Sequence, residues 1–87
     1  MKITITQSAK NSLFDIYAYH VEYSEAYADD FQYKIDEFIV RNLSEFPKIG
    51  HVHNRDLGLY RLIFDARYNI YYQIREAEIF VLYVLDG

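Results

Sequence analysis

Residues 59–85 read LYRLIFDARYNIYYQIREAEIFVLYVL and set the architecture of the chain. This stretch holds three β-rich runs separated by two short links. The runs cover residues 59–64, 68–75 and 78–85, and the links are Asp65-Ala66-Arg67 and Glu76-Ala77. β-Branched and aromatic residues dominate each run, as is typical of strands. Links of two or three residues are too short for a crossover, so we expect the three strands to pair antiparallel.

Alternation along these runs predicts a sheet with two apolar faces. Strict alternation groups Tyr68, Ile70, Tyr72 and Ile74 on one face, with Tyr71 and Gln73 on the other. In the last run it groups Phe80, Leu82 and Val84 against Ile79, Val81, Tyr83 and Leu85. Helices can cover only one face. The apolar surplus on the other is either buried by curling of the sheet or left for a partner, and we favour a partner.

Two amphipathic helices precede the strands. From Ala9 onward apolar residues recur at helical spacing for about fifteen residues, with Ser8 as the expected N-cap. Ser24 and Glu25 give the cap and acidic first turn of a second helix, which should end at Phe46 because the next residue is proline. Its apolar stripe comprises Tyr27, Ala28, Phe31, Ile35, Phe38, Ile39, Asn42 and Leu43. The short joint between the helices predicts an antiparallel hairpin.

The remaining segments complete an α+β order. Lys2–Thr6 alternates polar and apolar residues like a short strand, and Pro47–Gly58 has the proline, glycine and polar residues of a loop. The predicted order is β-α-α-β-β-β. We therefore expect one domain over residues 1–87, in which a helical hairpin packs on a mostly antiparallel four-stranded sheet.

The composition is that of a folded, acidic protein. Of its 87 residues, 52% are hydrophobic and 25% charged, which is too apolar for disorder. The net charge of −4 has the wrong sign for a domain that binds nucleic acid by neutralising many phosphates. Residues 8–46 hold eight acidic residues against three basic ones, so any positive patch must be built in the C-terminal half. Cysteine is absent, which excludes disulfides and thiolate metal sites.

Targeting signals are not evident in the sequence. No apolar run approaches the roughly 20 residues that a membrane-spanning helix needs. The N-terminus leads directly into a strand pattern instead of the apolar core of a signal peptide. We expect a cytoplasmic protein that makes no membrane contact.

Arg61 is the basic residue most in need of an explanation. It stands among Leu59, Tyr60 and Leu62 in a strand, where a guanidinium must find acceptors or reach water. One explanation is a structural ion pair with an acid of the helices or the adjacent turn. The other is a groove that binds a carboxylate or phosphate, to which Arg55 and Arg67 could add charge.

The three histidines carry weaker signals. His51 and His53 would point to the same side of an extended segment, as some metal sites require, but the sequence fixes no third ligand. We therefore expect surface histidines and no metal. His20 lies near the buried stripe of the first helix and is expected to be a rim histidine hydrogen-bonded to a neighbour.

An ordered set of residues along nearly the whole chain resembles one protein family. In chain order the set is Ala9, Leu13, Ile16, Tyr19, Ala28, Phe31, Ile35, Leu43, Phe46-Pro47, Gly50, Gly58, Arg61, Leu62, Tyr68-Asn69-Ile70-Tyr71-Tyr72 and Ile79–Gly87. This pattern is similar to that of the RelE/ParE toxins of type II toxin-antitoxin systems, and of the ParE branch in particular.

The resemblance implies a toxin that poisons DNA gyrase by binding it, without a cofactor or catalytic residues of its own. A cognate ParD-like antitoxin would hold it inactive, seated on an apolar sheet face or a helix groove. On this basis the residues that we assign to target or antitoxin binding are Arg55, Tyr60, Arg61, Arg67, Tyr71, Tyr83 and Asp86.

Two alternatives stay open at this stage. The RelE branch implies a ribosome-dependent mRNA endoribonuclease, with Arg61 and either Arg55 or Arg67 holding a phosphate. The sequence departs from that branch where Asp86 replaces a common histidine and Asn69 a common arginine. The second alternative is a degenerate, non-toxic member that only binds antitoxin. The sequence decides neither the antitoxin's identity nor whether the chain forms homodimers.

Overall fold

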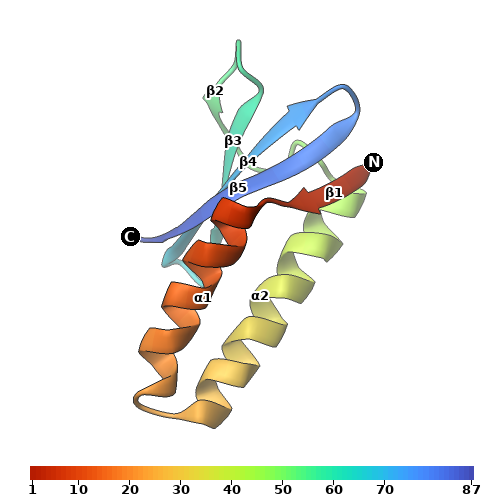
Figure 1. Cartoon of the computed structure of the whole chain (residues 1–87). Helices are drawn as coiled ribbons and strands as arrows, with labels where there is room; N and C mark the ends of the chain where they lie inside the picture. The colour runs from red at the N-terminus through yellow and green to blue at the C-terminus, as the bar shows by residue number, and fades with distance from the viewer.

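The computed structural model describes residues 1–87 as two layers, a five-stranded sheet and a helical hairpin (Figure 1). The elements are β1 (Lys2–Ile5), α1 (Gln7–Val21), α2 (Glu25–Glu45), β2 (His51–Asn54), β3 (Leu59–Phe64), β4 (Tyr68–Arg75) and β5 (Glu78–Asp86). The predicted α+β class and the antiparallel helical hairpin are confirmed. In Figure 1 the joint between α1 and α2 lies at the far end of the molecule from the sheet.

The sheet corrects the predicted strand count and pairing. Its strand order is β1-β5-β4-β3-β2, with β1 parallel to β5 and all other neighbours antiparallel. The prediction of a four-stranded, mostly antiparallel sheet is therefore wrong in its number of strands, and the sheet is mixed.

The missed strand, β2, lies inside the segment predicted as a loop. Three of its four residues have a partner in β3, with His51 opposite Arg61 and Val52 opposite Tyr60. A register shift between Val52 and Asn54 leaves His53 as an extra residue in a bulge, and the pairing resumes with Asn54 opposite Leu59. Only Val52 has a strong strand preference, so the neighbouring β3 backbone determines this strand more than its own sequence does.

The parallel pair forms where the chain returns beside its own start. Ile3 lies opposite Ile79, and the Thr6 hydroxyl donates to the Val81 carbonyl oxygen over 2.7 Å. The same Thr6 oxygen accepts from the Ala9 amide over 3.2 Å, so Thr6 and not Ser8 caps α1. A side chain held by β5 thus sets the point at which α1 leaves the sheet.

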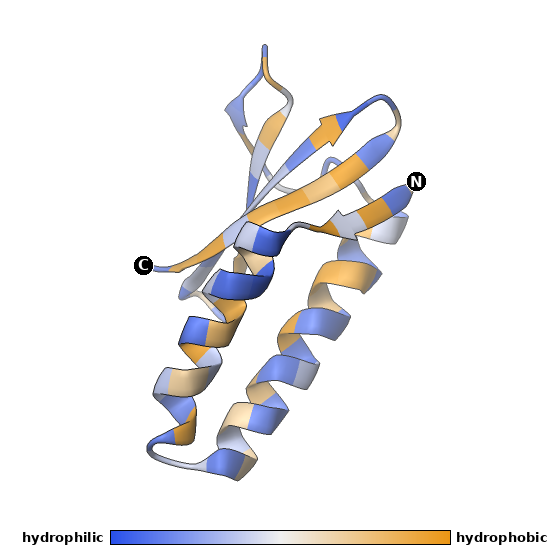
Figure 2. Ribbon diagram, in the orientation of Figure 1, coloured by the Kyte–Doolittle hydropathy of each residue, from blue (hydrophilic) through white to orange (hydrophobic).

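One hydrophobic core joins the helices to the sheet (Figure 2). Its 13 buried members are Ala9, Leu13, Phe31, Ile35, Ile39, Leu43, Leu62, Tyr68, Ile70, Tyr72, Ile79, Val81 and Val84. The predicted shared face of β4 is confirmed, since Tyr68, Ile70 and Tyr72 are all buried.

The predicted alternation along β5 is wrong after Leu82. Tyr71 pairs with Tyr83 but the next residue, Tyr72, pairs with Val81, which leaves Leu82 as an extra residue in a bulge. The bulge reverses the alternation, so Val84 enters the core instead of Tyr83.

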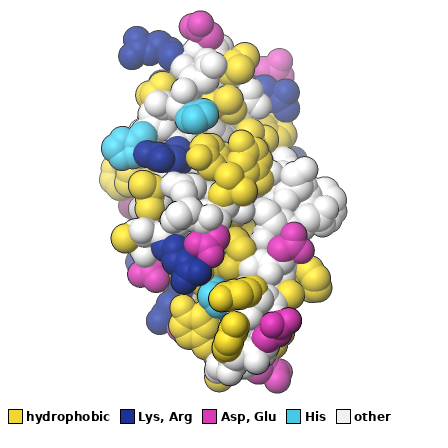
Figure 3. Space-filling model, turned by 90° about the vertical axis from the view of Figure 1, so that its left-hand side faces the viewer, with side chains coloured by type: hydrophobic (Ala, Val, Ile, Leu, Met, Phe, Trp, Pro, Cys, Tyr) yellow, Lys and Arg dark blue, Asp and Glu magenta, His cyan; other side chains and the backbone are white.

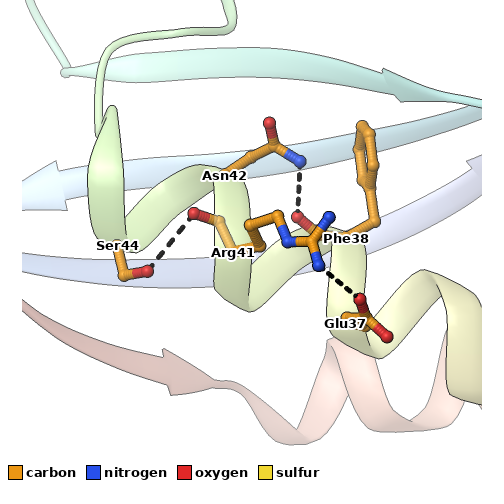
Figure 4. Close-up of polar contacts among 5 residues, drawn as sticks. All are labelled: Glu37, Phe38, Arg41, Asn42 and Ser44. Atoms are coloured by element: carbon orange, nitrogen blue, oxygen red, sulfur yellow. Dashed lines mark hydrogen bonds and ion pairs between the residues drawn. The ribbon is translucent and has the colours of Figure 1, made fainter.

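Helix α2 follows its predicted pattern except at Tyr27, which was placed in the apolar stripe but is 52% exposed, and its polar side chains are satisfied locally. Ser24 caps it as predicted, with its hydroxyl oxygen accepting from the Tyr27 amide over 3.1 Å. Near its C-terminal end Arg41 contacts Glu37 over 2.8 Å, and Asn42 donates to the Phe38 carbonyl oxygen (Figure 4). Because these contacts stay within one helix, this polar group needs no external ligand. Neither α1 nor α2 combines the length and apolarity required to cross a membrane.

Two of the three β-hairpin turns, those that follow β3 and β4, use a left-handed backbone without glycine, whereas the β2–β3 turn places Gly58 at a φ of 65°. The central residues are Asp65 and Ala66 in one turn, with φ of 56° and 54°, and Glu76 and Ala77 in the other, with φ of 49° and 62°. Such turns prefer Asn-Gly because a Cβ disfavours positive φ.

Glycine in either turn should therefore stabilise the fold. We expect Ala66→Gly and Ala77→Gly each to raise the free energy of unfolding by about 1 kcal/mol, measured by urea denaturation. Ala18→Gly, at an ordinary helical position of α1, is the matched control and should lower it by about 1 kcal/mol. Destabilisation by both turn variants would contradict this account.

Candidate functional site

The face of the sheet opposite the helices carries a row of side chains that crosses four strands. His51 lies opposite Arg61, Arg61 opposite Tyr71, and Tyr71 opposite Tyr83. Residues directly opposite in a sheet project to the same side. The Tyr71 and Tyr83 rings stack with centroids 4.9 Å apart, and the His53 ring meets Tyr71 edge-on at 5.3 Å. We call these five residues the open-face row.

The open-face row combines positive charge with aromatic surface. Figure 3 shows histidine and basic side chains beside a hydrophobic cluster in the upper half of this view. Apolar exposure continues along the face through Ile63 and Leu85, which are 39% and 49% exposed. The predicted apolar surplus on the uncovered face is thus present, and Ile63, Tyr83 and Leu85 are exposed.

Arg61 has no acidic partner. The chain forms three ion pairs, Asp30–Lys34, Glu37–Arg41 and Arg67–Asp86, and none includes Arg61. The structural ion pair considered for Arg61 is therefore wrong. Its guanidinium remains available to an anionic group or to an aromatic or carboxylate side chain of another molecule.

Arg67 and Asp86 are occupied with each other. Two hydrogen bonds join the Arg67 guanidinium to the Asp86 carboxylate, at 2.8 and 2.7 Å. This contact holds the pKa of the Asp86 carboxyl below its usual value. Arg67 follows the β3–β4 turn, several residues along the sheet from Arg61 and with its charge already paired. The structure therefore does not bring it into one cationic surface with Arg61.

The other two predicted residues lie apart from the row. Arg55 is exposed in the turn between β2 and β3. Tyr60 lies on the core side of the sheet, where its ring stacks on Tyr72 at 5.2 Å and 12°. Of the seven residues assigned from the sequence, Arg61, Tyr71 and Tyr83 are thus brought together.

The sequence did not reveal the role of β2 in this site. His51 and His53 enter the open-face row because β2 pairs with β3, and their spacing of two residues was the available signal. The chain has no group of three or more His, Cys, Asp or Glu side chains placed to hold a metal ion. His20 is where it was expected, buried, with Nε2 2.8 Å from the Tyr68 hydroxyl.

A second unpartnered surface is a groove between the two helices. It has a volume of about 550 Å³ and is lined by Ile5, Lys10, Leu13, Phe14, Tyr17, Gln32, Asp36, Ile39 and Val40. Phe14 and Val40 are 66% and 54% exposed although both are apolar. Apolar grooves suit the apolar face of a partner helix. We call this surface the helix groove.

A family model and a solved structure each match nearly the whole chain. A family model described as the ParE toxin of type II toxin-antitoxin system, parDE, matches residues 3–87. A solved structure described as the chromosomal ParDE TA system from P. aeruginosa contains a chain of the same fold, with a TM-score of 0.82 and 20% sequence identity. The match covers 99% of this chain and 95% of that one. No curated protein matches the sequence.

Proposed function

Because the chain belongs to the ParE toxin family of type II toxin-antitoxin systems, we propose that it inhibits DNA gyrase by binding it and is neutralised by a cognate ParD-like antitoxin. The observation that carries the proposal is the presence of two separate unpartnered surfaces, the helix groove and the open-face row. A protein that binds a target and an antitoxin needs surface for both. Action on gyrase would place the protein in the cytoplasm.

The helix groove is the better antitoxin site. Its lining is mostly apolar, and Lys10 and Asp36 offer one charge of each sign at its margin. An amphipathic helix binds such a groove through residues spaced three and four apart. Exposed Phe14 supplies the kind of large apolar contact on which interface energy concentrates.

The open-face row is the better target site. Tyrosine and arginine are enriched among the residues that dominate binding energy, and Arg61, Tyr71 and Tyr83 stand side by side here. The net charge of −4 favours a protein target over bulk DNA. Binding through this face requires no catalytic group on the toxin.

Induction of the chain alone in a bacterial host tests the proposal. We expect growth arrest with filamentation and a DNA-damage response while translation continues. Purified protein should also block gyrase supercoiling, and Arg61→Ala should weaken the block about tenfold or more. Asn11→Ala, on exposed helical surface, is the control and should leave it unchanged. Arrest without DNA damage and with active gyrase would refute gyrase as the target.

One observation supports a RelE-like mRNA endoribonuclease as a second candidate. The open-face row places an unpaired guanidinium beside two imidazoles, which could stabilise a phosphate and transfer a proton. This reading expects immediate translation arrest and cleaved transcripts, both lost in Arg61→Ala. Transcript cleavage that persists in Arg61→Ala would exclude this use of the row.

A non-toxic, antitoxin-binding member is distinguished by the same induction. It would leave growth unaffected while the antitoxin complex still formed. That result would retain the helix groove as a binding site and remove the toxin activity from the proposal.

A further inference from the structure

The tip of the helical hairpin exposes a cluster of aromatic rings that the core does not use. Tyr19, Tyr23 and Tyr27 are 53%, 75% and 52% exposed. The centroid of the Tyr19 ring lies 5.4 Å from that of Tyr23 and 5.6 Å from that of His20. The His20 and Tyr27 ring centroids are 5.0 Å apart. We call Tyr19, Tyr23 and Tyr27, together with the buried His20 between them, the tyrosine tip.

The tyrosine tip shares no residue with either of the surfaces discussed above. In Figure 1 the α1–α2 joint projects away from the sheet. In Figure 3 hydrophobic side chains gather around a histidine near the lower end of the molecule, with both acidic and basic side chains close by. None of the residues of the tip lines the helix groove. The tip is therefore a third surface.

Apart from Arg67 on the neighbouring β3–β4 turn, the charged side chains around the tyrosine tip are acidic. No lysine or arginine occurs between Lys10 and Lys34, whereas five acids do, namely Asp15, Glu22, Glu25, Asp29 and Asp30. Asp30 is paired with Lys34, and Asp29 accepts a hydrogen bond from the Tyr17 hydroxyl over 2.6 Å. Glu22 and Glu25, which flank Tyr23 in the sequence, make no ion pair.

Exposed tyrosines with carboxylates at their margin select a cationic ligand. The face of an aromatic ring carries negative potential and attracts a cation, most favourably a planar guanidinium that can stack on it. The molecule already contains such a contact next to the tip, since the Arg67 guanidinium carbon lies 5.1 Å from the centre of the Tyr68 ring. That arginine is neutralised by Asp86, so it leaves the acidic charge of the tip uncompensated.

We propose that the tyrosine tip is a docking site for an arginine-bearing segment of a partner protein. Guanidinium groups stack on Tyr19 and Tyr23, and the carboxylates of Glu22 and Glu25 pair with them. The proposal depends on neither the antitoxin groove nor the toxin's target. It predicts that the acidic hairpin selects arginine over other positively charged groups.

Two synthetic peptides of equal length and charge test this site. One alternates glycine with arginine and the other glycine with lysine, and each is titrated into the full chain by calorimetry and by NMR of the tyrosine ring signals. We expect the arginine peptide to bind about tenfold more tightly than the lysine peptide, because only guanidinium stacks well on the rings. Ring signals of Tyr19 and Tyr23 should shift on binding.

Matched variants separate stacking from simple charge attraction. Tyr19→Ser combined with Tyr23→Ser should weaken binding of the arginine peptide about tenfold and reduce its preference over lysine. Tyr33→Ser is the control, because Tyr33 is 69% exposed on the same acidic helix but outside the tip. Glu22→Gln with Glu25→Gln should weaken binding of both peptides. Absence of binding, equal affinity for the two peptides, or an equal effect of Tyr33→Ser would overturn the proposal.

Discussion

Phe14→Asp combined with Val40→Asp should abolish neutralisation of the toxin by its antitoxin. We expect the affinity of the two proteins to fall at least about 100-fold, because two carboxylates would be buried without partners against the apolar face of the antitoxin. Both residues are exposed in the free chain, so the core does not depend on them. Cells that produce the variant and the antitoxin together should stop growing, whereas cells with the unaltered pair should not.

Tyr33→Asp is the matched control for this prediction. It adds the same charge to an exposed aromatic position of α2 that lies outside the helix groove. Its antitoxin affinity, measured by surface binding kinetics, should stay within about twofold of that of the unaltered chain. Unchanged affinity in the groove variant would show that the antitoxin binds elsewhere. Melting curves for all three proteins should coincide, since the substituted side chains are exposed.

The sequence predicted those parts of the fold that local periodicity encodes. Apolar residues recur about every 3.6 residues along α2 and every two residues along the three long strands. These two periods predicted the helical hairpin and the β-hairpins. β2 was missed because His51 and Asn54 carry no strand preference and the strand exists only through pairing with β3. The bulge at Leu82 was missed because it depends on the register between two strands, which neither strand reveals alone.

The candidate site was predicted only in part for the same reason. Strand alternation gave Tyr71, and Arg61 was conspicuous as a charge in an apolar run. Its neighbours His51 and His53 required the unpredicted β2. The pairing of Arg67 with Asp86 joins residues 19 positions apart and removes a basic residue that the sequence suggested was free.

Acidic and basic residues lie on different surfaces of the molecule because they lie in different parts of the sequence. The helical hairpin holds most of the acids, and the open-face row holds Arg61 with two histidines and no acid. A partner with separate basic and acidic surfaces is therefore oriented as it approaches, with its basic surface toward the helical hairpin. Complementary charge of this kind affects the association rate more than the final affinity. Most of the binding energy would then come from the apolar and aromatic side chains of the helix groove and the open-face row.

Tyr72→Ala should lower the free energy of unfolding by about 3–5 kcal/mol, the largest stability loss that we expect from one side chain. Tyr72 is fully buried, and its ring stacks on Tyr60. Its hydroxyl also accepts a hydrogen bond from the Gly50 amide over 3.0 Å, which ties the end of the α2–β2 connection to the sheet. A domain of this size has a total stability on the order of 4–13 kcal/mol, so the variant should lose a large share of it and melt at a clearly lower temperature.

Tyr72→Phe isolates the hydroxyl from the ring. It keeps the stacking on Tyr60 and removes only the acceptor for Gly50, so we expect a loss of about 1–2 kcal/mol in urea denaturation and faster hydrogen exchange at the Gly50 amide. Tyr33→Phe, at an exposed tyrosine, should change neither quantity. Equal losses in the Phe and Ala variants would assign the whole effect to the hydroxyl. Unchanged hydrogen exchange at the Gly50 amide would instead show that the hydrogen bond does not protect this amide. The packing of the Tyr72 ring would then be what holds the α2–β2 connection on the sheet.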